Sequence, residues 1–434
     1  VLFFPWLAHG HLSPFYELAK RLSKKNFKTY VCSTPINLMS IQAAPDSAVE
    51  LIELHMPPSL KLPPEFHTSR NAPPNIGHAL MQEFQLCKSN FLDILTSIKP
   101  DLLIYDLLQP WSAKQALSMS IPSVFFGTSC TANYSYYHHL DNNGFAEKYP
   151  FKAIYLHDHE KIELRGYNNF IEDVGDGFLF GSFNLSTEII LVKSYGKFEA
   201  KYGCHLSALS KKKLVLTGPL IAESVDLDGT KKSNEIMNWL NDQRKFSIVY
   251  VSFGSEYSPS KQQIYEISKA LELSRVMFLW VIRFGIGEKE ISLKEVLPKG
   301  FLDRTKDNGI IVNEWVPQKR ILAHPSIGAF ISHCGWSSVT ESLYFGVPII
   351  GMPFHTDQPI NARLLVEVGA ALEVERKPNG IYMGTAIAET ITEVVFNETV
   401  YQVMKKRVVD LSNEIRANEE EALNGVGEEL RKIC

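Results

Sequence analysis

Short apolar runs alternate with amphipathic helical patterns from one end of this chain to the other, and this alternation constrains its fold most strongly. Strands are expected at 1–8, 27–34, 49–56, 101–108 and 122–128, and again at 247–255, 276–283, 309–316, 327–334, 347–353 and 370–375. Apolar residues on both faces of such runs are typical of strands buried in a parallel sheet with helices between them. The sequence therefore predicts an α/β layer architecture.

Two domains are expected, because the chain has 434 residues and 45% hydrophobic content, enough for two ordinary cores. The polar interval 223–233 separates the two series of strands. We predict an N-terminal domain at 1–222, a linker region at 223–240, a C-terminal domain at 241–412, and a helix at 413–434 that packs back on the first domain. Open parallel sheets bind ligands beyond the carboxyl ends of their strands, so we expect the ligands in a cleft between the two domains.

The overall composition argues against several classes of protein. A net charge of -4 and a pI of about 6.4 disfavour a general nucleic-acid binder. No apolar run approaches the roughly 20 residues that a membrane-spanning helix needs. Six scattered cysteines are typical of reduced, mostly buried thiols, so we expect a cytoplasmic protein, and we expect it to be a monomer. Because the sequence opens directly in an apolar run, we also expect a few residues to precede Val1.

The segment from Trp315 to Gln358 gathers side chains suited to holding a nucleotide and a sugar. Trp315 ends an expected strand, where its indole could stack on a flat base. The backbone of Val316 would then be available to contact the edge of that base. Packing of the indole in the core is the alternative.

Residues 333–338 (HCGWSS) form an expected turn from a strand into a helix. Gly335 lets a ligand approach the backbone, and a helix that begins at Ser337 directs unpaired N–H groups at an anion. His333 could donate a further hydrogen bond to a phosphate. The alternative is an ordinary serine-capped helix beside a core histidine. A nucleophilic Cys334 is disfavoured, because nothing places a base toward it.

Two further positions carry carboxylates that suit sugar hydroxyls. Glu341 lies one turn into this helix, on the face of Ser337 and Ser338, where it could accept both hydroxyls of a ribose. Asp357 and Gln358 begin the next expected helix and offer a carboxylate and an amide to a hexose. A solvated helix-face Glu and ordinary N-terminal helix chemistry are the alternatives.

A histidine base with an orienting carboxylate is expected in the first half of the chain. Residues 9–14 (HGHLSP) follow the first apolar run, and a histidine in this turn has a pKa suited to accepting a proton near neutrality. Asp106 ends another strand of the same sheet and could orient this histidine. A helix-entry histidine and an aspartate N-cap are the alternatives.

The chain resembles the plant secondary-product glycosyltransferases that use UDP-sugars, over nearly its whole length and almost residue for residue from Trp315 to Gln358. The motifs PWLAHGHLSPF, IYDLLQPW, HTSRNAPP and VSFGSEY resemble the branch that adds a sugar to an existing glycoside. The resemblance implies a GT-B fold, in which two Rossmann-like parallel-sheet domains face an interdomain cleft.

The resemblance also implies which residues bind the donor. Trp315 stacks on uracil, Glu341 holds the ribose, and His333 with the turn amides holds the diphosphate. The full set of donor-binding residues is Ser255, Trp315, Val316, Gln318, His333, Gly335, Trp336, Ser337, Ser338, Glu341, Asp357, Gln358 and Thr128. The family usually has Asn after HCGW, where this chain has Ser337, so we expect altered donor contacts rather than lost binding.

The resemblance selects His11 over His9 as the base and Asp106 as its partner. It implies direct displacement with inversion at the anomeric carbon, no metal and no permanently bound cofactor. The Asp357-Gln358 ending is similar to that of members that use UDP-glucose, and the expected acceptor is a flavonoid, terpenoid or similar glycoside. UDP-xylose, UDP-galactose or UDP-rhamnose as the donor, and an aglycone as the acceptor, remain open.

Four other patterns indicate different chemistry only weakly. The D-x-D of residues 226–228 lies in the polar linker and is interpreted as solvated charge. The pairs at 138–139 and 157–159 are interpreted as surface loops rather than metal ligands. The glycines at 285–287 lack the third glycine of a dinucleotide fingerprint, which disfavours an oxidoreductase. A non-catalytic binding protein is disfavoured because it needs no base such as His11.

Overall fold

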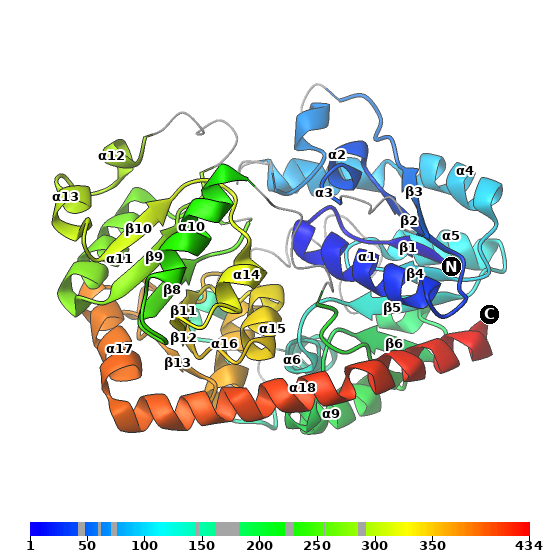
Figure 1. Ribbon diagram of the computed structural model, residues 1–434. Helices are drawn as coiled ribbons and strands as arrows, with labels where there is room; N and C mark the ends of the chain where they lie inside the picture. The colour runs from blue at the N-terminus through cyan, green and yellow to red at the C-terminus, as the bar shows by residue number, and fades with distance from the viewer. Residues whose placement is uncertain are drawn as a thin grey trace. The chain divides into compact units, whose positions relative to one another are not determined.

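The computed structural model describes residues 1–41, 48–59, 62–70, 76–144, 147–161, 182–221, 230–255, 257–284 and 292–434. The chain divides into two compact units. Unit 1 comprises Val1–Pro150, Arg165–Ile221 and Ala417–Cys434, and unit 2 comprises Phe151–Leu164 and Ala222–Arg416 (Figure 1). Each unit is therefore assembled from separate stretches of the sequence.

Unit 1 is built on a parallel sheet with the strand order β3-β2-β1-β4-β5-β6-β7 in the described residues. These strands are β1 (Leu2–Phe4), β2 (Thr29–Ser33), β3 (Val49–Glu53), β4 (Leu103–Tyr105), β5 (Ser123–Gly127), β6 (Ile189–Val192) and β7 (Lys213–Leu216). The chain runs outward from β1 to β3 and then returns to place β4 on the other side of β1. The order of the strands thus reverses between β1 and β4.

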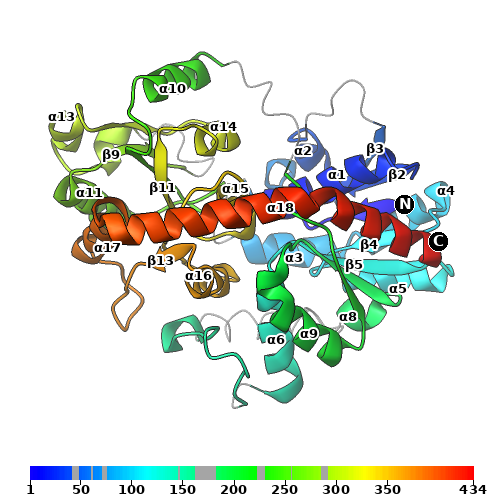
Figure 2. The same cartoon turned by 60° about the horizontal axis from the view of Figure 1, so that its bottom comes forward.

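Helices cover both faces of this sheet because successive strand residues point to opposite faces. The helices are α1 (His9–Ser23), α2 (Pro35–Leu38), α3 (Gly77–Gln85), α4 (Lys88–Ile98), α5 (Pro110–Ser118), α6 (Thr131–Asn143), α8 (Ser182–Leu185), α9 (Ala200–Ser210) and the end of α18 (Glu398–Ile433), with 3-10 turns η1 (Pro64–Phe66) and η2 (Lys197–Glu199). Phe4 of β1 packs with α3, α4 and α5, whereas its neighbour Phe3 packs with α1 and α18. Both views show α1 and α18 on one face of the sheet (Figure 1; Figure 2).

Unit 2 is built on a second parallel sheet, with the order β10-β9-β8-β11-β12-β13 in the described residues. Its strands are β8 (Ile248–Ser252), β9 (Met277–Val281), β10 (Gly309–Val312), β11 (Ile327–Ser332), β12 (Ile349–Gly351) and β13 (Ala371–Glu373). Its helices are α10 (Lys231–Asn241), α11 (Lys261–Ser274), α12 (Leu293–Val296), α13 (Phe301–Thr305), α14 (Gln318–Leu322), α15 (Trp336–Tyr344), α16 (Gln358–Glu367), α17 (Gly384–Phe396) and the first part of α18. Val251 of β8 packs with α11 and α17, and its neighbour Tyr250 packs with α10 and α14. The strand order reverses between β8 and β11.

The two parallel sheets confirm the predicted α/β architecture, with differences at the ends of elements. The strands are shorter than the apolar runs that predicted them, and β6 and β7, each four residues long, were not predicted. The predicted linker 223–240 lies partly outside the described residues, and its second part forms α10. The C-terminal helix spans Glu398–Ile433, and its part from Ala417 onward belongs to unit 1.

Two predictions about side-chain environment have opposite outcomes. All six cysteines are free thiols and four of them are buried, as expected. The assignment of His138 and His139 to a surface loop is wrong, because both are buried on α6, where His138 packs edge-on against Phe183. None of the helices in the described part of the chain combines the length and apolar content that a membrane crossing requires.

Candidate active site

The candidate base of unit 1 lies where the order of its strands reverses. Asp106 directly follows β4, and His11 lies in the first turn of α1, just after β1. Nδ1 of His11 is 2.8 Å from Oδ2 of Asp106. The His11 side chain is 28% exposed, and Asp106 is fully buried. The crevice at such a reversal is where open α/β sheets bind ligands. The sequence placed His11 in a turn, whereas it is part of the helix.

Backbone amides fix the Asp106 carboxylate in the orientation that His11 requires. The amide of Trp6 donates to Oδ2 at 3.0 Å, and that of Leu107 donates to Oδ1 at 2.6 Å. An ionised carboxylate only accepts hydrogen bonds, so Nδ1 of His11 must carry the proton that it shares with Asp106. This tautomer puts the lone pair of the neutral ring on Nε2, the arrangement of an oriented general base.

Thr128 is the third side chain in this group. It follows β5, and its hydroxyl lies 3.2 Å from Nδ1 of His11. The resemblance assigned Thr128 to donor binding, whereas its contact here is with the candidate base. Its hydroxyl can accept part of the same N–H, which further restricts rotation of the His11 ring.

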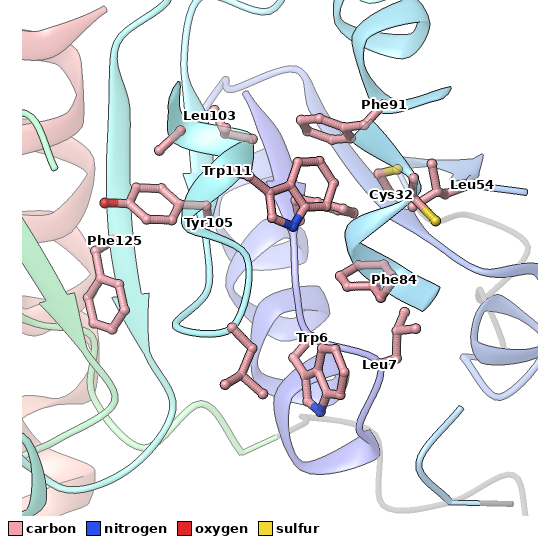
Figure 3. Close-up of a cluster of buried hydrophobic side chains, with 14 of the residues drawn as sticks. Trp6, Leu7, Cys32, Leu54, Phe84, Phe91, Leu103, Tyr105, Trp111 and Phe125 are labelled. Carbon is pink, nitrogen blue, oxygen red and sulfur yellow. The ribbon is translucent and has the colours of Figure 1, made fainter. Parts of the chain in front are cut away.

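An aromatic core supports the strand that leads to His11 (Figure 3). Trp111 packs edge-on against Phe91 and Phe84, and Phe84 packs edge-on against Trp6, with ring centroids 5.4–5.8 Å apart. The side chain of Gln109 donates to the carbonyl of Phe4 at 2.6 Å. The backbone that carries the Trp6 amide, and through it Asp106, is therefore held by close packing.

In unit 2, the turn after β11 is built around the ring of His333. A Cβ atom added at Gly335 would lie 2.4 Å from Nε2 of His333, and one added at Gly254 would lie 2.8 Å from its Cε1. Both positions therefore require glycine. Cys334 between them has φ of 62°, a left-handed conformation that costs energy for a residue with a side chain. Asn361 of α16 donates to the carbonyl of Cys334 at 2.9 Å and holds the turn.

The imidazole of His333 is neutral near pH 7. Burial, and after it the neighbouring His355, lower the pKa of His333 to about 3. Its Nδ1 is buried and has no hydrogen-bond partner among the described residues. A buried polar atom of this kind can be satisfied by a ligand. Burial also raises the pKa of the Cys334 thiol far above its usual range, so Cys334 stays protonated and is no nucleophile.

The helix that follows this turn begins without a side-chain cap. The sequence predicted a start at Ser337 with serine capping, but α15 begins at Trp336 with Gly335 as the N-cap, and no side chain of the described residues caps it. The serine prediction is wrong because the glycine required beside His333 occupies the capping position. The amino end of a helix that begins in this way can bind an anion through its backbone amides and the positive end of the helix dipole. Trp336 itself is buried.

Three predicted donor-binding side chains of unit 2 form one hydrogen-bonded cluster. Gln318, the first residue of α14, donates to Oε2 of Glu341 at 2.8 Å and to Oγ of Ser338 at 3.1 Å. The hydroxyl of Tyr250 in turn donates to the side-chain oxygen Oε1 of Gln318 at 3.3 Å. Ser338 and Glu341 thus share one face of α15, as the sequence predicted. A carboxylate held in this way can accept further hydrogen bonds from a diol.

Trp315 is on the surface, which excludes the alternative of core packing. It follows the end of β10 at Val312, and 43% of its surface is exposed. The guanidinium of Arg283 lies 4.5 Å from the centroid of its ring. With a cation over one face of the indole, a base would stack on the other face. Val316, the next residue, is buried.

Asp357 and Gln358 stand at the start of α16, as predicted. Oδ2 of Asp357 accepts from Nδ2 of Asn361 at 3.0 Å. The Gln358 side-chain oxygen accepts from the amides of Phe354 and His355 at 2.9 and 3.3 Å. Because that oxygen is engaged, Gln358 can offer a sugar only its amide N–H groups.

The remaining sequence patterns lie partly within and partly outside the described residues. Within the described ranges, no group of three or more His, Cys, Asp or Glu side chains is arranged to hold a metal ion. Asp226-Leu227-Asp228 and the glycines at 285–287 lie outside the described residues. Ser255 follows β8 at the reversal between β8 and β11. His157 and His159 lie in unit 2, with their rings stacked 5.6 Å apart.

Sequence reasoning missed three residues of these sites. Arg283 covers Trp315, Asn361 ties α16 to the turn after β11, and Tyr250 donates to Gln318. Arg283 is the last residue of the expected strand 276–283, and that position was the available signal. Asn361 lies 27 residues from its partner, and no local pattern marks that pairing.

Comparison with known proteins gives consistent matches over the whole chain. Residues 214–416 match the family model described as UDP-glucoronosyl and UDP-glucosyl transferase. The chain is 42% identical over 433 residues to UDP-glucosyltransferase 29 of Panax ginseng, covering 99% of this chain and 96% of the relative. It is 41% identical over 437 residues to the beta-D-glucosyl crocetin beta-1,6-glucosyltransferase of Gardenia jasminoides, with 99% and 98% covered. A solved ugt transferase from Siraitia grosvenorii in complex with UDP has the same fold, with a TM-score of 0.80 and 24% identity over 99% of each chain.

Proposed function

This chain belongs to the plant UDP-sugar-dependent glycosyltransferase family and has its GT-B fold, and we propose that it transfers glucose from UDP-glucose to a hydroxyl of a small-molecule glycoside. The observation that carries this proposal is the His11–Asp106 contact of 2.8 Å. A protein that only bound nucleotide sugars would need no oriented base.

In the proposed reaction, Nε2 of His11 accepts the proton of the acceptor hydroxyl as its oxygen attacks the anomeric carbon. The bond from that carbon to the diphosphate breaks on the opposite face, so the configuration inverts and UDP leaves. The Asp106 carboxylate then stabilises the imidazolium that forms. The buried position of Asp106 and its two amide donors support this role.

The leaving diphosphate gains negative charge that the donor site has to stabilise. We assign this task to the amides at the start of α15, to Ser338 and Ser255, and to His333 as a neutral donor. Preorganised amides and a helix dipole lower the energy of a developing anion without further rearrangement. The proposal therefore includes no metal.

The nucleoside and the sugar are assigned to separate groups of residues. Trp315 would stack on uracil, with Val316 and Gln318 beside it, and Glu341 would accept the ribose hydroxyls. Trp336, Asp357 and Gln358 would contact the hexose, and the Asp-Gln pair favours glucose. Ser337, where the family usually has Asn, leaves UDP-xylose, UDP-galactose or UDP-rhamnose as alternative donors.

The acceptor is proposed to be a glycoside, and the new bond is proposed to form on its sugar. The Gardenia jasminoides relative is named for adding glucose to a beta-D-glucosyl crocetin, and its identity to this chain extends over 437 residues. Direct transfer to an aglycone is the second candidate.

Turnover of a substrate panel detected by mass spectrometry tests the proposal. The purified protein would be incubated with each of the four UDP-sugars and with matched pairs of aglycones and their glucosides. We expect a gain of one hexose on glucosides with UDP-glucose. Transfer only to aglycones would show that the acceptor is an aglycone and not a glycoside. If no sugar were transferred from any of the UDP-sugars, the proposed function would be contradicted.

A further inference from the structure

A short segment of the first half of the chain is a structural part of unit 2. Residues 151–161 lie between α6 and β6 of unit 1 in the sequence, but they belong to the second unit. Ile154 and Leu156 of this segment are buried. A Cβ atom added at Gly380 would lie 2.9 Å from the His159 ring, which shows how closely the segment packs on unit 2.

The segment buries one carboxylate, Glu160, between two arginines of unit 2. Arg363 of α16 contacts both oxygens of Glu160, at 2.9 and 3.0 Å, and Arg376 contacts Oε1 as well. The Glu160 and Arg363 side chains are both 3% exposed. The amide of His157 also donates to Glu160 at 2.7 Å. Burial alone would raise the pKa of Glu160, but the two arginines hold it below its usual range.

Two routes lead from Glu160 to the turn that carries Asp357 and Gln358. The first runs through α16, because Arg363 lies two residues after Asn361, which contacts Asp357. The second runs through Arg376, whose guanidinium lies 5.4 Å from the centroid of the Tyr382 ring. The Tyr382 hydroxyl donates at 2.7 Å to the carbonyl of Pro353, at the start of the turn.

The turn itself is strained. Thr356 has φ of 57°, which costs energy for a β-branched residue. Phe354 stacks on Tyr257 with ring centroids 4.2 Å apart and packs edge-on against Tyr382. A strained turn keeps its conformation only when its surroundings determine it. The two arginines and Tyr382 are such surroundings.

We propose that Glu160 is a positioning residue for the donor sugar. By pairing with Arg363 and Arg376, it fixes the start of α16 and the preceding turn, so that Asp357 and Gln358 face the hexose. This inference rests on the proposed function, in which these two residues contact the sugar. The nucleoside contacts at Trp315 and Glu341 lie on other elements of unit 2 and are independent of Glu160.

Calorimetric binding of UDP and of UDP-glucose tests the inference with the full chain. Glu160→Gln keeps the shape of the side chain and removes its charge. We expect Kd for UDP-glucose to rise by about threefold to thirtyfold, while Kd for UDP is unchanged. Glu160→Asp, which restores the carboxylate, should recover part of the UDP-glucose affinity. Tyr382→Phe removes only the hydroxyl contact to Pro353, and it should raise Kd for UDP-glucose by a smaller factor. This second variant tests the inference if Glu160→Gln fails to fold.

The matched control is Glu266→Gln. Glu266 is another buried carboxylate of unit 2, and it accepts from the amide of Gly384 at 2.7 Å, between α11 and α17. We expect this variant to change both dissociation constants equally or not at all. Equal weakening of UDP and UDP-glucose by Glu160→Gln would overturn the inference and leave the proposed function standing. Failure of the wild-type protein to bind UDP would overturn the proposed function, and the inference with it.

Discussion

The Nδ1 atom of His11 lies 2.8 Å from the fully buried Oδ2 of Asp106, and the two residues follow adjacent strands, β1 and β4. The backbone amides of Trp6 and Leu107 donate to this carboxylate and fix its orientation independently of the imidazole. The fold therefore holds the proposed base in one orientation at the reversal of a parallel sheet.

Asp106→Asn should preserve the packing around residue 106 but should no longer hold the His11 ring in its orientation. An amide has one acceptor oxygen where Asp106 uses both, so it cannot satisfy the two backbone amides and His11 together. We expect kcat to fall by about a hundredfold to ten-thousandfold, with little change in KM for the UDP-sugar. Asp93→Asn, at an exposed position of α4, is the control and should turn over normally. A kcat within twofold of the wild type for Asp106→Asn would contradict the orienting role.

Trp315→Ala should weaken UDP binding without unfolding the protein, because Trp315 is largely on the surface. Loss of base stacking is expected to cost about 1–3 kcal/mol of binding free energy. Calorimetry with UDP measures this loss, and Trp315→Phe should recover part of it. The control is Tyr265→Ala, which removes an exposed aromatic side chain from α11. Equal UDP affinity in Trp315→Ala and the wild type would mean that the indole binds no base.

Gly335→Ala should damage both stability and UDP binding. The backbone of Gly335 has φ of -59°, which alanine adopts easily, so the damage would come only from the contact of 2.4 Å with His333. We expect a loss of about 1–3 kcal/mol in the free energy of unfolding, together with weaker UDP binding. Gly425→Ala has nothing within 4 Å of the added methyl group, inside α18. It should stabilise the protein by about 0.5–1 kcal/mol. Denaturant unfolding of both variants would show whether the changes have these opposite signs.

His138 should make the protein sensitive to acid. Burial, and after it the nearby His205, lower the pKa of His138 to about 4, from an ordinary value of 6.5. Between these values the unfolded chain binds a proton that the folded chain does not, so stability falls as the pH falls from about 6.5 to about 4. His138→Phe keeps a ring against Phe183 and removes this titration. Between pH 6.5 and pH 4, the free energy of unfolding should therefore decrease less in His138→Phe than in the wild type. The difference between the two slopes should be at most about 1.4 kcal/mol per pH unit. If the free energy of unfolding changed equally with pH in the variant and the wild type, the assignment of this acid sensitivity to His138 would be contradicted.

The sheets and the shared helix face of Ser338 and Glu341 could be predicted, because their signal in the sequence is local. Uninterrupted apolar runs located the central strands, and the spacing of Ser338 and Glu341 correctly placed them on one helix face. The strands β6 and β7 were not predicted, because an apolar run of four residues is too short to indicate a strand. The serine cap was predicted wrongly, because the clash that requires glycine at 335 involves a ring whose position the sequence does not show.

Contacts between distant parts of the chain could not be predicted. Glu160 pairs with Arg363 and Arg376, which lie 203 and 216 positions away in the sequence. The segment that carries Glu160 belongs to unit 2, although its neighbours in the sequence belong to unit 1. A single sequence contains no periodicity that marks such a pairing. Asn361, whose partner Cys334 lies 27 residues away, was missed for the same reason.

The most direct test of the account is the pair of measurements made on His11→Ala. Transfer from UDP-glucose, detected by mass, should be abolished, because no side chain then accepts the proton of the acceptor hydroxyl. Calorimetric binding of UDP should match the wild type, because the side chains proposed to contact UDP lie in unit 2 and His11 lies in unit 1. Normal turnover by this variant would contradict the account.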